Sequence, residues 1–187
     1  MKITLFTSNK NRHNYFINLF SYFCDELFVV QESGTIFPGI IPGHYPASET
    51  MKNYFEKVND AQTKLFGNSY VNNSSKNIKI LPMLSGDLNK CSSTFLSDFL
   101  KSDIYVVFGS SYIKGHLIDF LVEQKAINIH MGVSPYYRGT DCNFWALYDD
   151  NPHLVGATIH MLSKGLDSGS MLYHAMSNIK TNPFEYT

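Results

Sequence analysis

An uninterrupted apolar run at Ile104–Phe108, reading IYVVF, sets the strongest limit on the fold. A strand that is apolar at every position is buried on both faces, which is typical of the centre of a parallel sheet. The next segment, Gly115–Glu123, has helical spacing, and a second apolar run containing Asn128 follows it. This order of strand, helix and strand predicts a right-handed parallel crossover. We therefore expect an α/β fold, with a Rossmann-like, open and mostly parallel sheet that has helices on both faces.

The rest of the chain alternates between strand and helix patterns. Strands are predicted at Lys2–Thr7, Glu26–Gln31, Ile78–Leu81 (closed by Pro82), Gly156–Leu162 and Ser170–His174. Helices are predicted after the first strand and at Ser48–Phe66, Asp87–Leu100 and Asn143–Asp149, and Trp145 in the last of these is expected to be packed. A Gly/Pro-rich stretch at 34–46 is either a loop that shapes a site or an ordinary surface excursion.

Two polar side chains stand at the carboxyl end of the second strand of the crossover. Asn128 and His130 have the same parity, so both leave the same face of the strand. An amide beside an imidazole can bind a carbonyl oxygen that gains negative charge, and a nearby carboxylate would keep the imidazole protonated. Asp167, in the loop GLDSG at 165–169, is the candidate carboxylate. Each piece alone also fits a simpler interpretation, either a chance Asn-x-His or a hairpin turn in which Asp bonds its own backbone.

The order of the motifs resembles that of a known family. NIH at 128–130 is followed by SPYYRG, GATIHML, GLDSG and SMLYH, which is similar to the order found in the folate-dependent formyltransferases. The family's catalytic Asn, His and Asp fall on Asn128, His130 and Asp167. Gly132 and Val133 replace residues of the family's usual pattern, so the shape of this loop is not predicted.

The resemblance, which is specific from about Val106 to His174, implies the formyltransferase fold. It also implies an enzyme that takes a formyl group from 10-formyltetrahydrofolate and uses no metal. Arg138 would contact phosphate or ribose groups of the acceptor or brace the loop, and Tyr137 would stack on the acceptor or pack. The segment after the IYVVF run would form the pterin-side wall of a folate pocket, unless it is a plain strand-to-helix turn: Gly109, Ser110, Ser111, Tyr112 and Ile113.

Within the family, a nucleotide-linked amino sugar is the acceptor that this sequence favours, which would place the enzyme in lipopolysaccharide O-antigen biosynthesis. The turn at 8–14, SNKNRHN, contains no glycine, whereas the glycinamide ribonucleotide branch uses a glycine-rich phosphate loop there. The methionyl-tRNA branch carries an additional carboxyl-terminal domain and basic surfaces. The alternatives are a methionyl-tRNA formyltransferase-like enzyme, a hydrolase that gives the formyl group to water, and a non-catalytic folate-binding module.

Charge and cysteine usage narrow the partners and the location. The 187 residues include 15 Lys+Arg and 16 Asp+Glu, a formal charge of −1 that does not indicate bulk nucleic acid as a partner. Cys24, Cys91 and Cys142 are widely spaced, as expected of reduced thiols in the cytoplasm. The sequence shows neither a signal peptide nor a membrane span. Three scattered histidines lack an acidic partner at metal-ligand spacing and are predicted to be structural: His153, His160 and His174.

The last residues have the order of a helix start. Asn182 is a candidate N-cap, Pro183 suits the first helical position, and Glu185 lies three residues after the cap. We therefore expect a single formyltransferase catalytic domain over 1–187 that is truncated at its carboxyl-terminal end. By resemblance, a homodimer would form through the missing segment.

Overall fold

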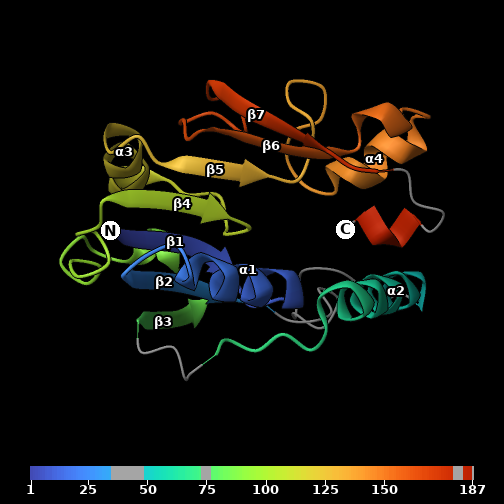
Figure 1. The fold of residues 1–187 in the computed structure, drawn as a ribbon. Helices are drawn as coiled ribbons and strands as arrows, with labels where there is room; N and C mark the ends of the chain where they lie inside the picture. The colour runs from blue at the N-terminus through green and yellow to red at the C-terminus, as the bar shows by residue number, and fades with distance from the viewer. Residues whose placement is uncertain (35–48, 73–76, 179–182, 187) are drawn as a thin grey trace.

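A seven-stranded sheet runs through the described residues of this computed structural model, 1–34, 49–72, 77–178 and 183–186 (Figure 1). Its strand order is β3-β2-β1-β4-β5-β6-β7. Neighbouring strands are parallel from β3 to β5, whereas β6 and β7 are antiparallel to their neighbours. The predicted α/β fold with a mostly parallel sheet is confirmed. The strands are β1 Lys2–Ser8, β2 Glu26–Ser33, β3 Ile78–Leu84, β4 Ile104–Phe108, β5 Ile127–His130, β6 Gly156–Met161 and β7 Met171–Met176.

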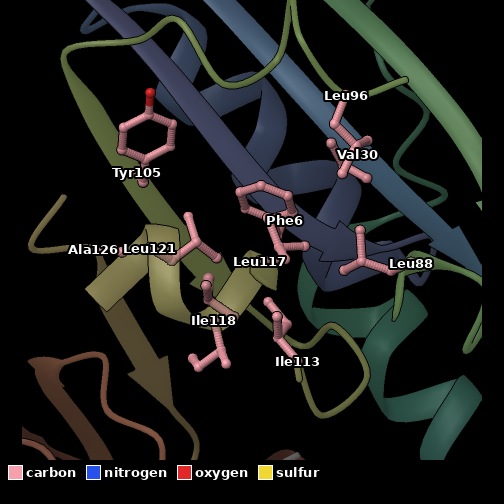
Figure 2. Packing of buried hydrophobic residues seen from close by; sticks show 11 residues of the cluster. Phe6, Val30, Leu88, Leu96, Tyr105, Ile113, Leu117, Ile118, Leu121 and Ala126 are labelled. Atoms are coloured by element: carbon pink, nitrogen blue, oxygen red, sulfur yellow. The ribbon is translucent and has the colours of Figure 1, made fainter. Parts of the chain in front are cut away.

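Helices cover both faces of this sheet. On one face, α3 (Gly115–Glu123) directs Leu117 and Leu121 onto Phe6 and neighbouring strand residues, as Figure 2 shows. On the other face, α1 (Asn11–Ser21) buries Ile17 in a second apolar cluster. The remaining helical segments are α2 Glu49–Phe66, α4 Cys142–Tyr148, and the 3-10 turns η2 Leu88–Lys90, η3 Pro152–Leu154 and η4 Pro183–Tyr186.

The carboxyl ends of β1 to β5 lie at one edge of the sheet, on the side where α2, α4 and the end of the chain gather (Figure 1). There β1 is flanked by β2 and β4. The connection after β1 leads to α1 on one face, while the connection after β4 leads to α3 on the other. Diverging connections of this kind open a crevice at the sheet edge, where ligands bind in open α/β folds.

Two predicted boundaries are wrong, and each has a local cause. Strand β3 continues through Pro82 to Leu84, because β3 is an outer strand whose free side tolerates a missing N–H group. The helix predicted at Asp87–Leu100 does not form beyond the short η2 turn. The hydroxyl of Ser92 accepts a hydrogen bond from the amide of Phe95 at 3.1 Å, a local bond that competes with the helical pattern.

Trp145 is also placed differently from the prediction. Helix α4 buries Cys142, Asn143 and Ala146 along one stripe, so Trp145 lies outside that stripe and is 49% exposed. The Gly/Pro-rich stretch lies outside the described residues except for Gly34, and so does the candidate N-cap Asn182. No helix in the described ranges is both long and apolar enough to cross a membrane.

Candidate active site

Strand β5 presents Asn128 and His130 on one face, as the sequence spacing predicts. The strand lies between the parallel strand β4 and the antiparallel strand β6. Asn128 is half-buried and His130 is 6% exposed. The two side chains therefore stand at the point where the parallel part of the sheet ends, close to the carboxyl edge.

The structure adds His160 to this pair. In the β5–β6 ladder Asn128 is the direct partner of His160, so their side chains share a face. The His160 ring is 1% exposed, with Nε2 3.0 Å from the Asn128 Nδ2 and Nδ1 2.8 Å from the carbonyl oxygen of Met161. A ring with its hydrogen on Nδ1 donates to Met161 and accepts from Asn128. Burial lowers the pKa of His160, but contact with Asp167 and the Met161 carbonyl outweighs burial and raises the pKa.

Asp167 lies in the connection between β6 and β7, and its side chain contacts side chains of both β5 and β6. Its Oδ1 accepts from the Asn128 Nδ2 at 3.0 Å, and its Oδ2 accepts from the backbone amide of Gly139 at 2.9 Å. Its backbone has a φ of 42°, in the left-handed region. Burial acts to raise the pKa of Asp167, but contact with His160 and the Gly139 amide outweigh it and hold the pKa below 3.8. The carboxyl group is therefore ionised at neutral pH.

The His130 ring is held between two oxygen acceptors. Its Nδ1 is 3.3 Å from the Asp167 Oδ2, and its Nε2 is 3.0 Å from the backbone oxygen of Tyr137. The neighbouring Gly132 has no room for a side chain, because an added Cβ would lie 2.5 Å from both the His130 Nε2 and the Cys142 Cβ. Only glycine therefore fits at position 132 with these neighbours in place.

A cavity of about 630 Å³ lies in front of these side chains. Asn128, His130, His160 and Asp167 line it, and so do Lys10, Arg12 and His13 from the turn after β1 and the start of α1. All five residues that were predicted for the folate pocket lie on its wall: Gly109, Ser110, Ser111, Tyr112 and Ile113.

This wall segment is anchored by Glu32, which the sequence analysis did not identify. Glu32 is 2% exposed and accepts hydrogen bonds from the Ser111 amide at 2.6 Å, the Ser111 hydroxyl at 2.8 Å and the Gly86 amide at 2.8 Å. The Tyr112 hydroxyl donates to the Lys164 carbonyl oxygen at 2.6 Å and so joins the wall to the Asp167 loop. Glu32 follows the apolar run of β2, one residue beyond the strand predicted from the sequence, and only the tertiary fold brings it to Ser111.

Two other predicted site residues lie outside the cavity wall. Among the described residues, Arg138 is exposed and is not part of that wall. The Tyr137 hydroxyl donates to Asp149 at 3.1 Å and accepts from the Asn151 amide at 3.0 Å, so its ring braces the α4 end of the loop. The described residues contain no group of three or more His, Cys, Asp or Glu side chains that could hold a metal ion.

Comparison with known proteins gives one family. The sequence profile of the formyl transferase family matches residues 98–184. Two curated relatives are methionyl-tRNA formyltransferases. The one from Desulforamulus reducens is 28% identical over 66% of this chain and 36% of its own length. The one from Thermosynechococcus vestitus is 36% identical over 39% of this chain and 22% of its own length. The chain thus spans about a third or less of the curated relatives that it matches.

Solved structures share the fold over almost the whole chain. Phosphoribosylglycinamide formyltransferase from Anaplasma phagocytophilum has a TM-score of 0.59 and 16% identity, with 99% of this chain and 76% of that chain covered. A sugar N-formyltransferase from a Shewanella species has a TM-score of 0.56 and 17% identity, with 99% and 62% covered. The family match covers Asn128, His130 and Asp167. The carboxyl-terminal part of this chain is therefore similar to the formyl transferase family that its motif order resembles, and almost the whole chain shares the fold of solved formyltransferases.

Proposed function

We propose that this protein transfers a formyl group from 10-formyltetrahydrofolate to the amine of a small acceptor. The observation that carries the proposal is the convergence of Asn128, His130 and Asp167 on one wall of the 630 Å³ cavity. These three groups come together because β5 pairs with β6 in one register, which brings the β6–β7 connection beside Asn128 and His130. A module that only binds folate has no need of this set.

The cavity has the features that a folate needs. Its floor includes the apolar side chains of Val107, Ile118 and Leu162, and the 109–113 wall offers backbone groups at the rim. A flat pterin ring requires an apolar slot with a few fixed polar groups, and a cavity of this size can enclose most of such a ligand. When bound, the folate would supply the formyl carbonyl that the amine attacks, and the bond between the formyl carbon and the folate nitrogen would break, with the proton lost by the amine passing to that nitrogen.

The side chains then have separate roles. The attacking amine must lose a proton, and the ionised Asp167 is the acceptor nearest to the face that carries Asn128. The formyl oxygen gains negative charge, and the Asn128 amide would donate to it. The Asn128 Nδ2 now contacts both His160 and ionised Asp167, so Asn128 must give up one of these contacts to donate to the formyl oxygen. His130 lies on the same face, and its Nε2 could donate to the formyl oxygen only by giving up the Tyr137 carbonyl oxygen.

For the acceptor, we propose a nucleotide-linked amino sugar. The turn after β1 has no glycine with which to wrap a single phosphate, and it places Lys10 and Arg12 on the cavity wall instead. Methionyl-tRNA is the second candidate, because the curated relatives carry that name. A homodimer and a cytoplasmic location remain predictions.

The test is incubation with 10-formyltetrahydrofolate and two acceptor sets, namely nucleotide-linked amino sugars and methionyl-tRNA, followed by mass spectrometry. A formylated sugar with wild-type protein, but not with Asp167→Asn, is the expected result. Formylated methionyl-tRNA would favour the second candidate, and formate release without any formylated acceptor would favour a hydrolase. Intact donor and acceptors after incubation with folded wild-type protein would contradict the transferase proposal.

A further inference from the structure

A second cavity, of about 330 Å³, opens beside the first between α2, α4 and η4. Figure 1 shows these three segments gathered at the carboxyl edge of the sheet. The cavity is lined by six aromatic side chains: Tyr54, Phe55, Phe144, Tyr148, Phe184 and Tyr186. The Tyr54 ring meets Phe144 edge-on at 6.3 Å, and Phe144 and Tyr148 are stacked at 6.1 Å with 22° between their planes. Aromatic walls of this kind favour a planar ring as the occupant.

A buried amide gives this cavity a polar contact. Gln62 is 2% exposed and lines the cavity, and its Nε2 finds no acceptor among the described residues. Buried donors without partners are rare in folded proteins, because leaving one unpaired is destabilising. A carbonyl group on a ring bound between the aromatic walls would supply the missing acceptor. Uracil, thymine and guanine each carry such a carbonyl.

Two cations connect the second cavity to the first. Lys10 and Arg12 line both cavities. Within the described residues, neither forms an ion pair with a carboxylate. Burial lowers the pKa of Arg12, and the carboxylate of Asp141 only partly opposes that effect. Two positive charges on the lining that both cavities share favour an anion between them.

We propose that the aromatic cavity holds the base of a nucleoside diphosphate, with Gln62 bonded to a base carbonyl and Lys10 and Arg12 on the diphosphate. The attached sugar then extends into the first cavity, where its amine reaches Asp167. This inference rests on the proposed function only for the direction of the sugar. The seat for the base and the diphosphate follows from the aromatic walls, the unpaired amide and the shared cations.

The first test uses wild-type protein and isothermal titration calorimetry with UDP, dTDP, GDP and inorganic pyrophosphate. Stacking and the Gln62 contact should make at least one nucleotide bind about 5- to 100-fold more tightly than pyrophosphate. Equal affinities within twofold for all four probes would overturn the proposal, and this comparison does not depend on the folding of any variant.

Variants then assign the contacts. Tyr148→Ala and Gln62→Met should weaken binding of the preferred nucleotide about 5-fold or more and leave pyrophosphate unchanged, whereas Arg12→Gln should weaken both probes. Tyr22→Ala and Lys101→Gln are matched surface controls, with Tyr22 81% exposed and the Lys101 side chain 71% exposed. Unchanged nucleotide affinity in folded Tyr148→Ala and Gln62→Met would overturn the seat for the base.

The two proposals fail in different ways. If nucleotide binding depends on Tyr148 and Gln62 but no acceptor is formylated, the proposed binding site for the base is supported and the transferase proposal is contradicted. If a sugar is formylated while folded Tyr148→Ala and Gln62→Met bind its nucleotide as wild type does, the seat is overturned and the transferase proposal stands. Asp167→Asn should retain nucleotide binding, because Asp167 does not line the aromatic cavity among its described residues.

Discussion

Replacing Asp167 by asparagine removes one negative charge from the centre of the site and keeps the size of the side chain. Asp167 accepts from the Asn128 amide at 3.0 Å and from the Gly139 amide at 2.9 Å, one of these two amides to each oxygen, and its Oδ2 also faces the His130 Nδ1 at 3.3 Å. Asparagine has a single oxygen, so one of the two donors must face an NH₂ group. A buried donor left without an acceptor costs about 1–3 kcal/mol. The free energy of unfolding of Asp167→Asn at pH 7 should fall by about that amount.

The same substitution removes the group that we propose as the proton acceptor for the attacking amine. General-base catalysis contributes about 10²–10⁴-fold to the rate, so kcat should fall within that range while the Kd for tetrahydrofolate changes little. The assay is stopped-time mass spectrometry of the formylated product beside equilibrium binding. Asp98→Asn, an exposed residue in a surface ion pair, is the matched control. A folded Asp167→Asn protein that keeps a tenth or more of the wild-type kcat would refute the role assigned to Asp167.

The pH dependence of stability gives an independent check on Asp167. Its pKa in the folded protein is lowered from the ordinary value of 3.8, so its charge stabilises the fold above that pH. The stability difference between wild type and Asp167→Asn should be constant from about pH 5 to 7 and should close as the pH falls through the folded pKa, below 3.8. Urea unfolding at stepped pH measures it. A difference that widens below pH 3.8 would show that the carboxyl is not stabilised in its ionised form.

Three further predictions concern the surroundings of the site. Gly132→Ala would place a Cβ 2.5 Å from His130 and Cys142, and displacement of the His130 ring should lower kcat by about 10²-fold. Turnover of this variant at the wild-type rate would contradict the prediction. Glu32→Gln removes one oxygen from a three-donor site. It should therefore raise the KM for the folate donor more than it lowers kcat, and an unchanged KM would count against anchoring of the wall by Glu32 through Ser111. Burial raises the pKa of Cys142 to about 11 from 9.0, so alkylation by iodoacetamide at pH 8 should be about 100-fold slower in the folded than in the unfolded protein. Equal rates by peptide mass spectrometry would contradict that burial.

The sequence was sufficient where a property depends on neighbouring residues. The apolar run of β4 predicted a central strand, and the parity of Asn128 and His130 predicted their shared face. Asp167 was identified through the order of motifs, because no local pattern links it to β5. Its catalytic role and those of Asn128 and His130 remain predictions that the variants above test.

What the sequence did not predict depends on tertiary register. His160 belongs to the site because β6 pairs with β5 so that His160 faces Asn128, and a shift of one residue would turn it to the other face. The same limit applies to Glu32, whose three donors come from two distant connections. The helix wrongly predicted at 87–100 has a different cause. The helical spacing of its apolar residues was given more weight than the hydroxyl of Ser92, which forms a local hydrogen bond to the backbone instead.

The boundary between β5 and β6 divides the reactive groups between two parts of the chain. Asn128 and His130 precede the exposed turn at 149–150, while His160 and Asp167 follow it. Cleavage of the chain at that turn would leave each fragment with half of the groups. Recovery of the site on mixing would report directly on the pairing of β5 with β6, which makes this turn a natural position for a split-protein reporter.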